Sequence, residues 1–89
     1  MSPTRNISQD RRRTDPVPHV TLQLYAGRSD AEKARIADAL AKAVMESNGS
    51  SEDAVSVSIE DVDPAYWPRL YRSITARPER LYKPPGYTM

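Results

Sequence analysis

Pro18 is the residue whose chemistry depends most on its position, and it opens the stretch Pro-His-Val-Thr-Leu-Gln-Leu-Tyr-Ala-Gly-Arg at residues 18–28. An N-terminal proline carries a secondary amine that can accept a proton, since a free α-amine has a pKa of about 7.7–8.0. Inside a chain the same nitrogen is a tertiary amide without basicity. The 89-residue sequence begins at Met1, so Pro18 can serve as a base only in a form that lacks the preceding residues.

Residues 1–17 show neither strand nor helix periodicity, and we predict a disordered leader or a mis-assigned start there. Our hypothesis is the mis-assigned start, because Val17 can be encoded by GTG, which bacteria also use as a start codon. The codon would then be read as methionine, which is readily removed before a small residue such as proline, leaving Pro18 first. Proteolytic trimming is the other route. The Arg11–Arg13 run also leaves open a basic arm that touches phosphates.

The composition limits both the fold and the functions. With 89 residues, of which 38% are hydrophobic and none is phenylalanine, one small domain can bury only a modest core. No cysteine is present, which excludes disulfides and cysteine-held zinc, and a single histidine argues against a protein-held metal. A partner subunit is therefore the expected support. The net charge of +1 argues against nucleic acid, and no apolar run suits a membrane span or a secretory signal, so we predict a cytoplasmic location.

Two segments, residues 19–25 and 54–61, alternate apolar and polar residues as half-buried strands do. Between them, Ser29 and Glu32 form a capping box, apolar side chains recur at three- and four-residue spacing, and Gly49 suits a left-handed helix end. This order predicts an α+β fold built on a βαβ unit with parallel strands. One helix covers one face of so small a sheet, so the other must meet water or another subunit. That polar face comprises Thr21, Gln23, Tyr25, Ser56 and Ser58.

The remainder of the chain is predicted to be a short helix followed by an extended tail. Pro64 suits a first helical position, and Pro68 still lies within the first turn. Apolar and aromatic residues from Tyr66 to Ile74 recur close to helical spacing. Residues 77–87 are rich in proline and tyrosine, and this tail could cap a sheet edge or fold over a neighbour.

Taken together, these residues resemble the 4-oxalocrotonate tautomerase family. The likeness rests on Pro18-His-Val with the alternation that follows, on Gly27-Arg28-Ser29-Asp30, on the amphipathic helix and on Ala54-Val-Ser-Val-Ser-Ile-Glu-Asp-Val. The ending, from Pro64-x-x-Trp67 to Leu81-Tyr82-Lys83-Pro84-Pro85-Gly86-Tyr87, is similar to the longer bacterial branch, which tends to form dimers. The resemblance covers residues 18–87, and it makes 18–89 the tautomerase domain.

The resemblance implies that two subunits pair into a four-stranded sheet backed by two helices, and that the protein is an enzyme without cofactors. Pro18 would be its catalytic base, with an apolar pocket and nearby cations lowering the pKa of the amine. Arg28 matches the family's arginine that pairs with a substrate carboxylate, although it could also be a surface residue that supports the loop. Trp67 matches an aromatic wall of the pocket and could equally anchor the core.

Ser56 departs from the family pattern, because the best-known members carry a second arginine at this position. A serine cannot neutralise a second carboxylate, so either Arg69, Arg72 or Arg77 substitutes or the substrate has one carboxylate. We therefore expect a monoacid enol of the phenylenolpyruvate kind. His19 could hydrogen-bond this substrate or stabilise the dimer, besides a purely structural role.

Two further functions remain open at this point. A cofactor-free dehalogenase or decarboxylase on the same scaffold would need an acid that activates water, and Glu60 and Asp61 are the nearest in sequence. A non-catalytic dimeric binding module would follow if Pro18 is not N-terminal. The expected partners are a small keto or enol acid and a second copy of the chain, and the Ser56/Ser58 face and the long tail favour a homodimer over a hexamer.

Overall fold

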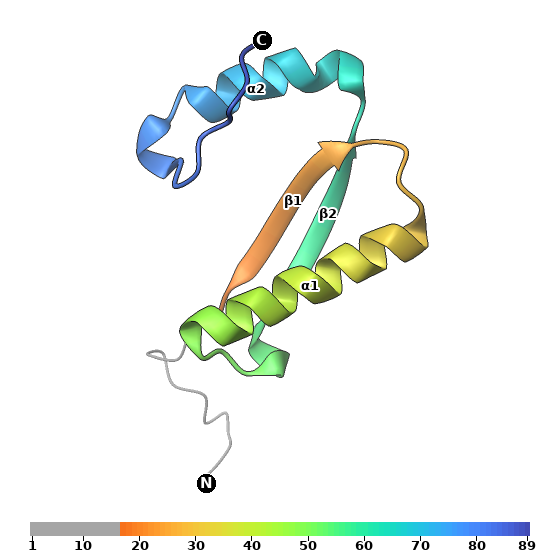
Figure 1. The fold of residues 1–89 in the computed structure, drawn as a ribbon, viewed down its shortest axis with the longest axis vertical. Coiled ribbons are helices and arrows are strands. Elements are labelled where there is room, and N and C mark those ends of the chain that lie inside the picture. Colours follow the sequence, from red (N-terminus) through yellow and green to blue (C-terminus); the bar gives the residue numbers. More distant parts are fainter. Residues whose placement is uncertain (1–16) are drawn as a thin grey trace, which may run out of the picture.

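The computed structural model describes residues 17–89, in which two strands, two helices and three short 3-10 turns follow one another (Figure 1). The elements are β1 (His19–Tyr25), α1 (Asp30–Asn48), β2 (Ser56–Val62) and α2 (Trp67–Thr75), with 3-10 turns at Glu52–Ala54, Pro64–Tyr66 and Pro78–Arg80. Apart from Val17, the leader that the sequence predicts lies outside the described residues.

The two strands run parallel, with His19 opposite Ser56 at one end of the ladder and Tyr25 opposite Val62 at the other. Backbone hydrogen bonds continue the pairing past both ends. The Ser56 N–H donates to the Pro18 carbonyl (3.2 Å), and the Ala26 N–H donates to the Val62 carbonyl (2.9 Å). The βαβ arrangement of an α+β fold is thereby confirmed.

Helix α1 begins and ends where the sequence predicts. The Ser29 hydroxyl accepts from the Glu32 N–H (3.1 Å), which caps the first turn. At the other end Gly49 has φ 77°, a conformation that glycine adopts without strain, and its N–H donates to the Met45 carbonyl (2.9 Å). The Glu32 carboxylate accepts from Arg28 Nη1 (3.2 Å), a contact that was not predicted.

Two boundaries differ from the sequence prediction. The second strand begins at Ser56, because residues 52–54 form a 3-10 turn in which the Val55 N–H donates to the Glu52 carbonyl (3.4 Å). The tail is also less extended than predicted, since it contains the turn Pro78–Arg80 and then folds back along α2 (Figure 1).

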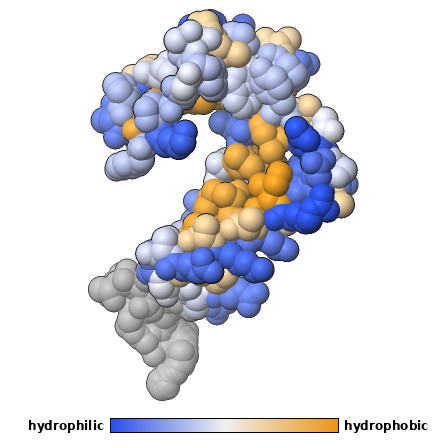
Figure 2. All heavy atoms as spheres, viewed as in Figure 1, coloured by the Kyte–Doolittle hydropathy of each residue, from blue (hydrophilic) through white to orange (hydrophobic). Residues whose placement is uncertain are grey.

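A single copy of the chain leaves its hydrophobic core incomplete. Among residues 17–89, only Val62 (5% exposed) and Ser50 (7% exposed) are buried, and the other aliphatic residues of β1 and β2 are half-buried. Helix α1 lies more over β2 than over β1. Figure 2 shows the consequence, an open hydrophobic area between β1 and α1.

One ion pair fastens α1 to the sheet. Lys33 Nζ donates to an Asp61 carboxylate oxygen at 2.8 Å, and this hydrogen bond raises the pKa of Lys33 above its ordinary value. Asp61 therefore points to the helix-covered side of β2.

No helix in the described part of the chain is long and apolar enough to cross a bilayer.

Candidate functional site

The first cluster of predicted site residues lies where β1 begins. Pro18 is half-buried directly before the strand, and His19 is its first residue. The His19 ring lies along β2, with Nδ1 2.7 Å from Ser56 Oγ and Nε2 3.1 Å from Ser58 Oγ. Because a hydroxyl can donate or accept, both serines can hold the imidazole in either of its charge states.

His19 also lies against the position at which the family pattern places a second arginine. Ser56, which marks the departure from the family pattern, is in direct contact with the His19 ring. The three arginines considered as substitutes lie on or after α2, which follows the opposite end of β2. One of them, Arg69, stacks its guanidinium on the Tyr66 ring, 5.2 Å from the centroid.

The second cluster lies beyond the other end of β1. Gly27 has φ 123°, a region that side-chain-bearing residues avoid, and it turns the chain so that Arg28 precedes the cap of α1. The Arg28 side chain is 60% exposed, and its pairing with Glu32 is a surface contact of small energetic weight. A guanidinium presents five N–H donors, so Arg28 can still bind an incoming carboxylate.

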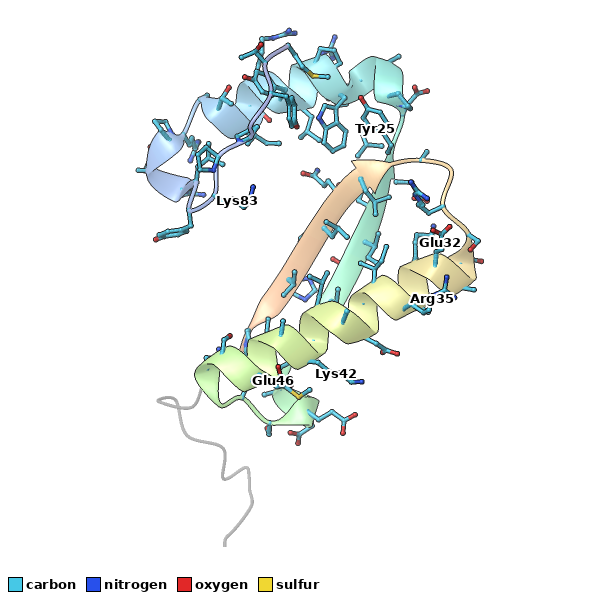
Figure 3. All side chains as sticks on the ribbon, viewed as in Figure 1. Tyr25, Glu32, Arg35, Lys42, Glu46 and Lys83 are labelled. Atoms are coloured by element: carbon cyan, nitrogen blue, oxygen red, sulfur yellow. The ribbon has the colours of Figure 1, made fainter. Side chains whose placement is uncertain are left out.

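Trp67, at the start of α2, belongs to the same end of the sheet. Its ring meets Tyr25, the last residue of β1, edge-to-face, with centroids 5.0 Å apart and planes at 76°. Figure 3 shows Tyr25 reaching toward the C-terminal part of the chain. A largely apolar hollow of ≈ 410 Å³ opens beside these rings, lined by Gln23, Leu24, Tyr25, Trp67, Tyr87 and Met89.

Sequence reasoning placed Trp67 at a pocket wall but did not find Tyr87 and Met89. Both come from the end of the tail, where no periodicity indicates what a side chain contacts. The Trp67 Nε1–H donates to the Tyr87 hydroxyl at 3.1 Å. An indole N–H without an acceptor costs free energy beside an apolar pocket. The need of Trp67 for an acceptor, which a tyrosine hydroxyl can supply, was the available signal for Tyr87.

In one chain the two clusters lie far apart. Strand β1 has seven residues, and at about 3.3 Å per residue it is roughly 23 Å long. Pro18 precedes one end of this strand and Arg28 follows the other. A small keto acid cannot contact both ends. The structure thus brings Pro18 beside His19 and sets Trp67 against the opposite end of β1, without joining the two clusters.

The two acids considered for water activation are both engaged by neighbours. Glu60 accepts from Gln23 Nε2 at 2.8 Å on the open face, and Asp61 pairs with Lys33 on the other face. A second hollow of ≈ 260 Å³ adjoins them, lined by Gln23, Glu60, Asp61, Val62, Asp63, Tyr66 and Leu70. Within residues 17–89, no three histidine or acidic side chains gather as a metal site would require.

Comparison with known proteins assigns the class. The family model described as "Tautomerase enzyme" matches residues 18–76, so the chain belongs to the tautomerase family. It is 40% identical over 73 residues to a "Probable tautomerase" of Xylella fastidiosa (strain 9a5c), which covers 80% of this chain and 89% of that protein. It is 31% identical over 75 residues to "Tautomerase PptA" of Klebsiella pneumoniae (strain 342), which covers 82% of this chain and all of that protein.

A shorter match connects the chain to the type of tautomerase that its sequence resembles. It is 35% identical over 46 residues to the "2-hydroxymuconate tautomerase" of Bacillus subtilis (strain 168), covering 52% of this chain and 74% of that protein. No solved structure matches. The protein is accordingly an isomerase of the tautomerase type, and the relatives favour neither the dehalogenase nor the binding module.

Proposed function

We propose that this protein is a cofactor-independent keto–enol tautomerase that uses the free amine of Pro18 as its base and acts, as a homodimer, on a monoacid enol such as phenylenolpyruvate. The observation that carries the proposal is the separation of two complementary clusters along β1. One end has the proline and the imidazole, and the other has the guanidinium and the aromatic wall. A small enol acid would need polar contacts from both of these clusters.

The chemistry needs one group that moves one proton. The neutral Pro18 amine would take the proton from the enol hydroxyl, the C=C electrons would shift, and the resulting ammonium would return a proton to carbon. A free α-amine suits this task, because its pKa of about 7.7–8.0 lies near the operating pH. An apolar wall such as Trp67 excludes water and favours the neutral amine.

Arg28 and His19 would bind the acid from its two sides. The Arg28 guanidinium can form two parallel hydrogen bonds to a planar carboxylate. His19, fixed by Ser56 and Ser58, can donate to the oxygen on which charge develops. With a serine in place of the second arginine, one carboxylate remains the better match, which supports a monoacid substrate.

A second copy of the chain would bring the clusters together. Strand β1 is an edge of a two-stranded sheet, so it can pair with β1 of another copy. Antiparallel pairing would set Pro18 of one copy beside Arg28 of the other. It would also cover the hydrophobic area between β1 and α1 that Figure 2 shows. A hexamer assembled from such dimers would preserve the same pairing.

The proposal requires Pro18 to be the first residue of the active form. Two comparisons support this: the family match begins at Pro18, and 82% of this chain accounts for the full length of the Klebsiella relative. Translation from the Val17 codon is the route we favour. The intact mass of the protein made from its native gene tests it, since a mass that corresponds to all 89 residues would contradict this start.

The activity itself is tested with two proteins assayed side by side. The ultraviolet decay of phenylenolpyruvate is followed with the chain that begins at Pro18 and with the 89-residue chain. We expect activity in the shorter chain alone, and its loss when the amine is chemically blocked. Inactivity of both chains would contradict the proposed function.

A further inference from the structure

The end of the tail is joined to the aromatic wall by specific contacts. The Tyr87 hydroxyl accepts the Trp67 Nε1–H at 3.1 Å. The backbone carbonyl of Tyr87 accepts from the Tyr71 hydroxyl at 3.3 Å, and the Tyr71 and Tyr87 rings lie 5.6 Å apart. Tyr71 lies one turn of α2 after Trp67, so one tail residue contacts two successive turns of the same helix.

The Trp67 indole is held by two tyrosines. Tyr25 meets one part of the ring edge-to-face, and the Tyr87 hydroxyl fixes the direction of its N–H. Met89, two residues further on, lines the same hollow. Tyr87 and Met89 of the tail therefore form part of the pocket wall, and Tyr87 also fixes the orientation of Trp67. Tyr82 provides a contrast, because its side chain is 97% exposed.

We infer that Tyr87 is a positioning residue of the tautomerase site: through its hydroxyl it orients the Trp67 indole, and with Met89 it closes the apolar end of the pocket. This inference rests on the proposed function, in which Trp67 is a wall of the pocket. An indole N–H that has lost its acceptor would turn toward another polar group or water, so the wall would lose its shape without any change in Pro18 or Arg28.

The test replaces only the acceptor. Tyr87→Phe keeps the ring and removes the hydroxyl, while Tyr82→Phe makes the same chemical change at an exposed position and serves as the control. Both are made in the chain that begins at Pro18. Because Trp67 is the only tryptophan, its fluorescence reports on the contact without reference to activity. Circular dichroism verifies that each variant is folded.

We expect Tyr87→Phe to shift the Trp67 emission, to increase its quenching by acrylamide, and to lower kcat/KM for phenylenolpyruvate roughly 3- to 10-fold. Tyr82→Phe should change none of these. A chain that ends at Pro85 removes both Tyr87 and Met89 and should lose more activity than Tyr87→Phe.

The outcomes separate the inference from the proposed function. An unchanged emission in Tyr87→Phe would overturn the contact, and a shifted emission with unchanged kcat/KM would overturn the positioning role. Equal effects of Tyr82→Phe and Tyr87→Phe would also overturn it. If the parent chain is inactive, both the proposed function and the positioning role of Tyr87 in catalysis are overturned, while the emission still reports whether Tyr87 and Trp67 are in contact.

Discussion

The two ends of β1 offer a substrate opposite kinds of chemistry. At the start of the strand, Ser56 and Ser58 hold the His19 imidazole, and Pro18, in the proposed form of the chain that begins with it, would carry an amine that can exchange a proton. Beyond the other end, Arg28 carries a permanent positive charge, and Trp67 stands against Tyr25 over an apolar hollow. In the proposed reaction the first cluster would move the proton and the second would bind the carboxylate, so neither end alone would make a complete site.

Burial leads to the same conclusion independently. A chain with only two buried residues among those described, and with an open hydrophobic area along β1, would gain stability from the proposed pairing. The strand that separates the two clusters also has a free edge, as does β2 in this two-stranded sheet. Pairing that edge in the antiparallel sense would complete the core and the site together.

The largest effect is expected at the start of β1. Adding one alanine before Pro18 converts its amine into an amide, and loss of a general base should lower kcat for phenylenolpyruvate by about 10²- to 10⁴-fold. Pro78→Ala, an exposed proline in the tail, is the control and should stay within about twofold, as surface changes do. Full activity in the extended chain would exclude Pro18 as the base.

At the other end, Arg28→Ala should lower kcat/KM roughly 10- to 100-fold, mainly through KM, because a charge-assisted contact to the carboxylate is lost. Arg35→Ala is the matched control. Arg35 is exposed on α1, and Figure 3 shows it on the outer side of the helix with Lys42 and Glu46. Similar kinetics for the two variants would show that Arg28 is a surface residue without a contact to the substrate.

A smaller effect is expected from His19. His19→Leu removes both ring nitrogens, and we expect kcat/KM to fall roughly 3- to 10-fold, the cost of one substrate hydrogen bond. Thr21→Val changes the next exposed residue on the same face and should leave the kinetics unchanged. A loss of stability without a kinetic change would assign His19 a structural role.

Much of the fold could be predicted from local patterns. Alternation located both strands, and Ser29 and Gly49 located the ends of α1. Pro64 located the start of the second helical segment, which opens with a 3-10 turn before α2. Each of these signals is short-range, because the residue type favours the backbone conformation at its own position or its immediate neighbours. The second strand was predicted two residues too early, because Ala54 continues the alternation while its backbone belongs to a 3-10 turn.

The site was predictable only in part, because its contacts are long-range. The family pattern indicated Pro18, Arg28 and Trp67 one at a time. The alternation of residues 19–25 predicted the strand that separates the first two, but no local signal indicates which distant residues each of them contacts. Tyr87 lies twenty residues from Trp67 and reaches it only through the folded tail. The contact of His19 with Ser56 likewise depends on the strand register. A cytoplasmic location stays a prediction of the sequence.

The most direct test of the shared site mixes two defective chains. The alanine-extended chain lacks the base and Arg28→Ala lacks the carboxylate contact, so with substrate well below KM each alone should retain about one tenth of the parent activity or less. If the site is shared, a mixed dimer has one site with both defects and one with neither. Random reassortment of equal amounts should then restore about one quarter of the parent activity. A mixture no more active than the average of its components would contradict the shared site.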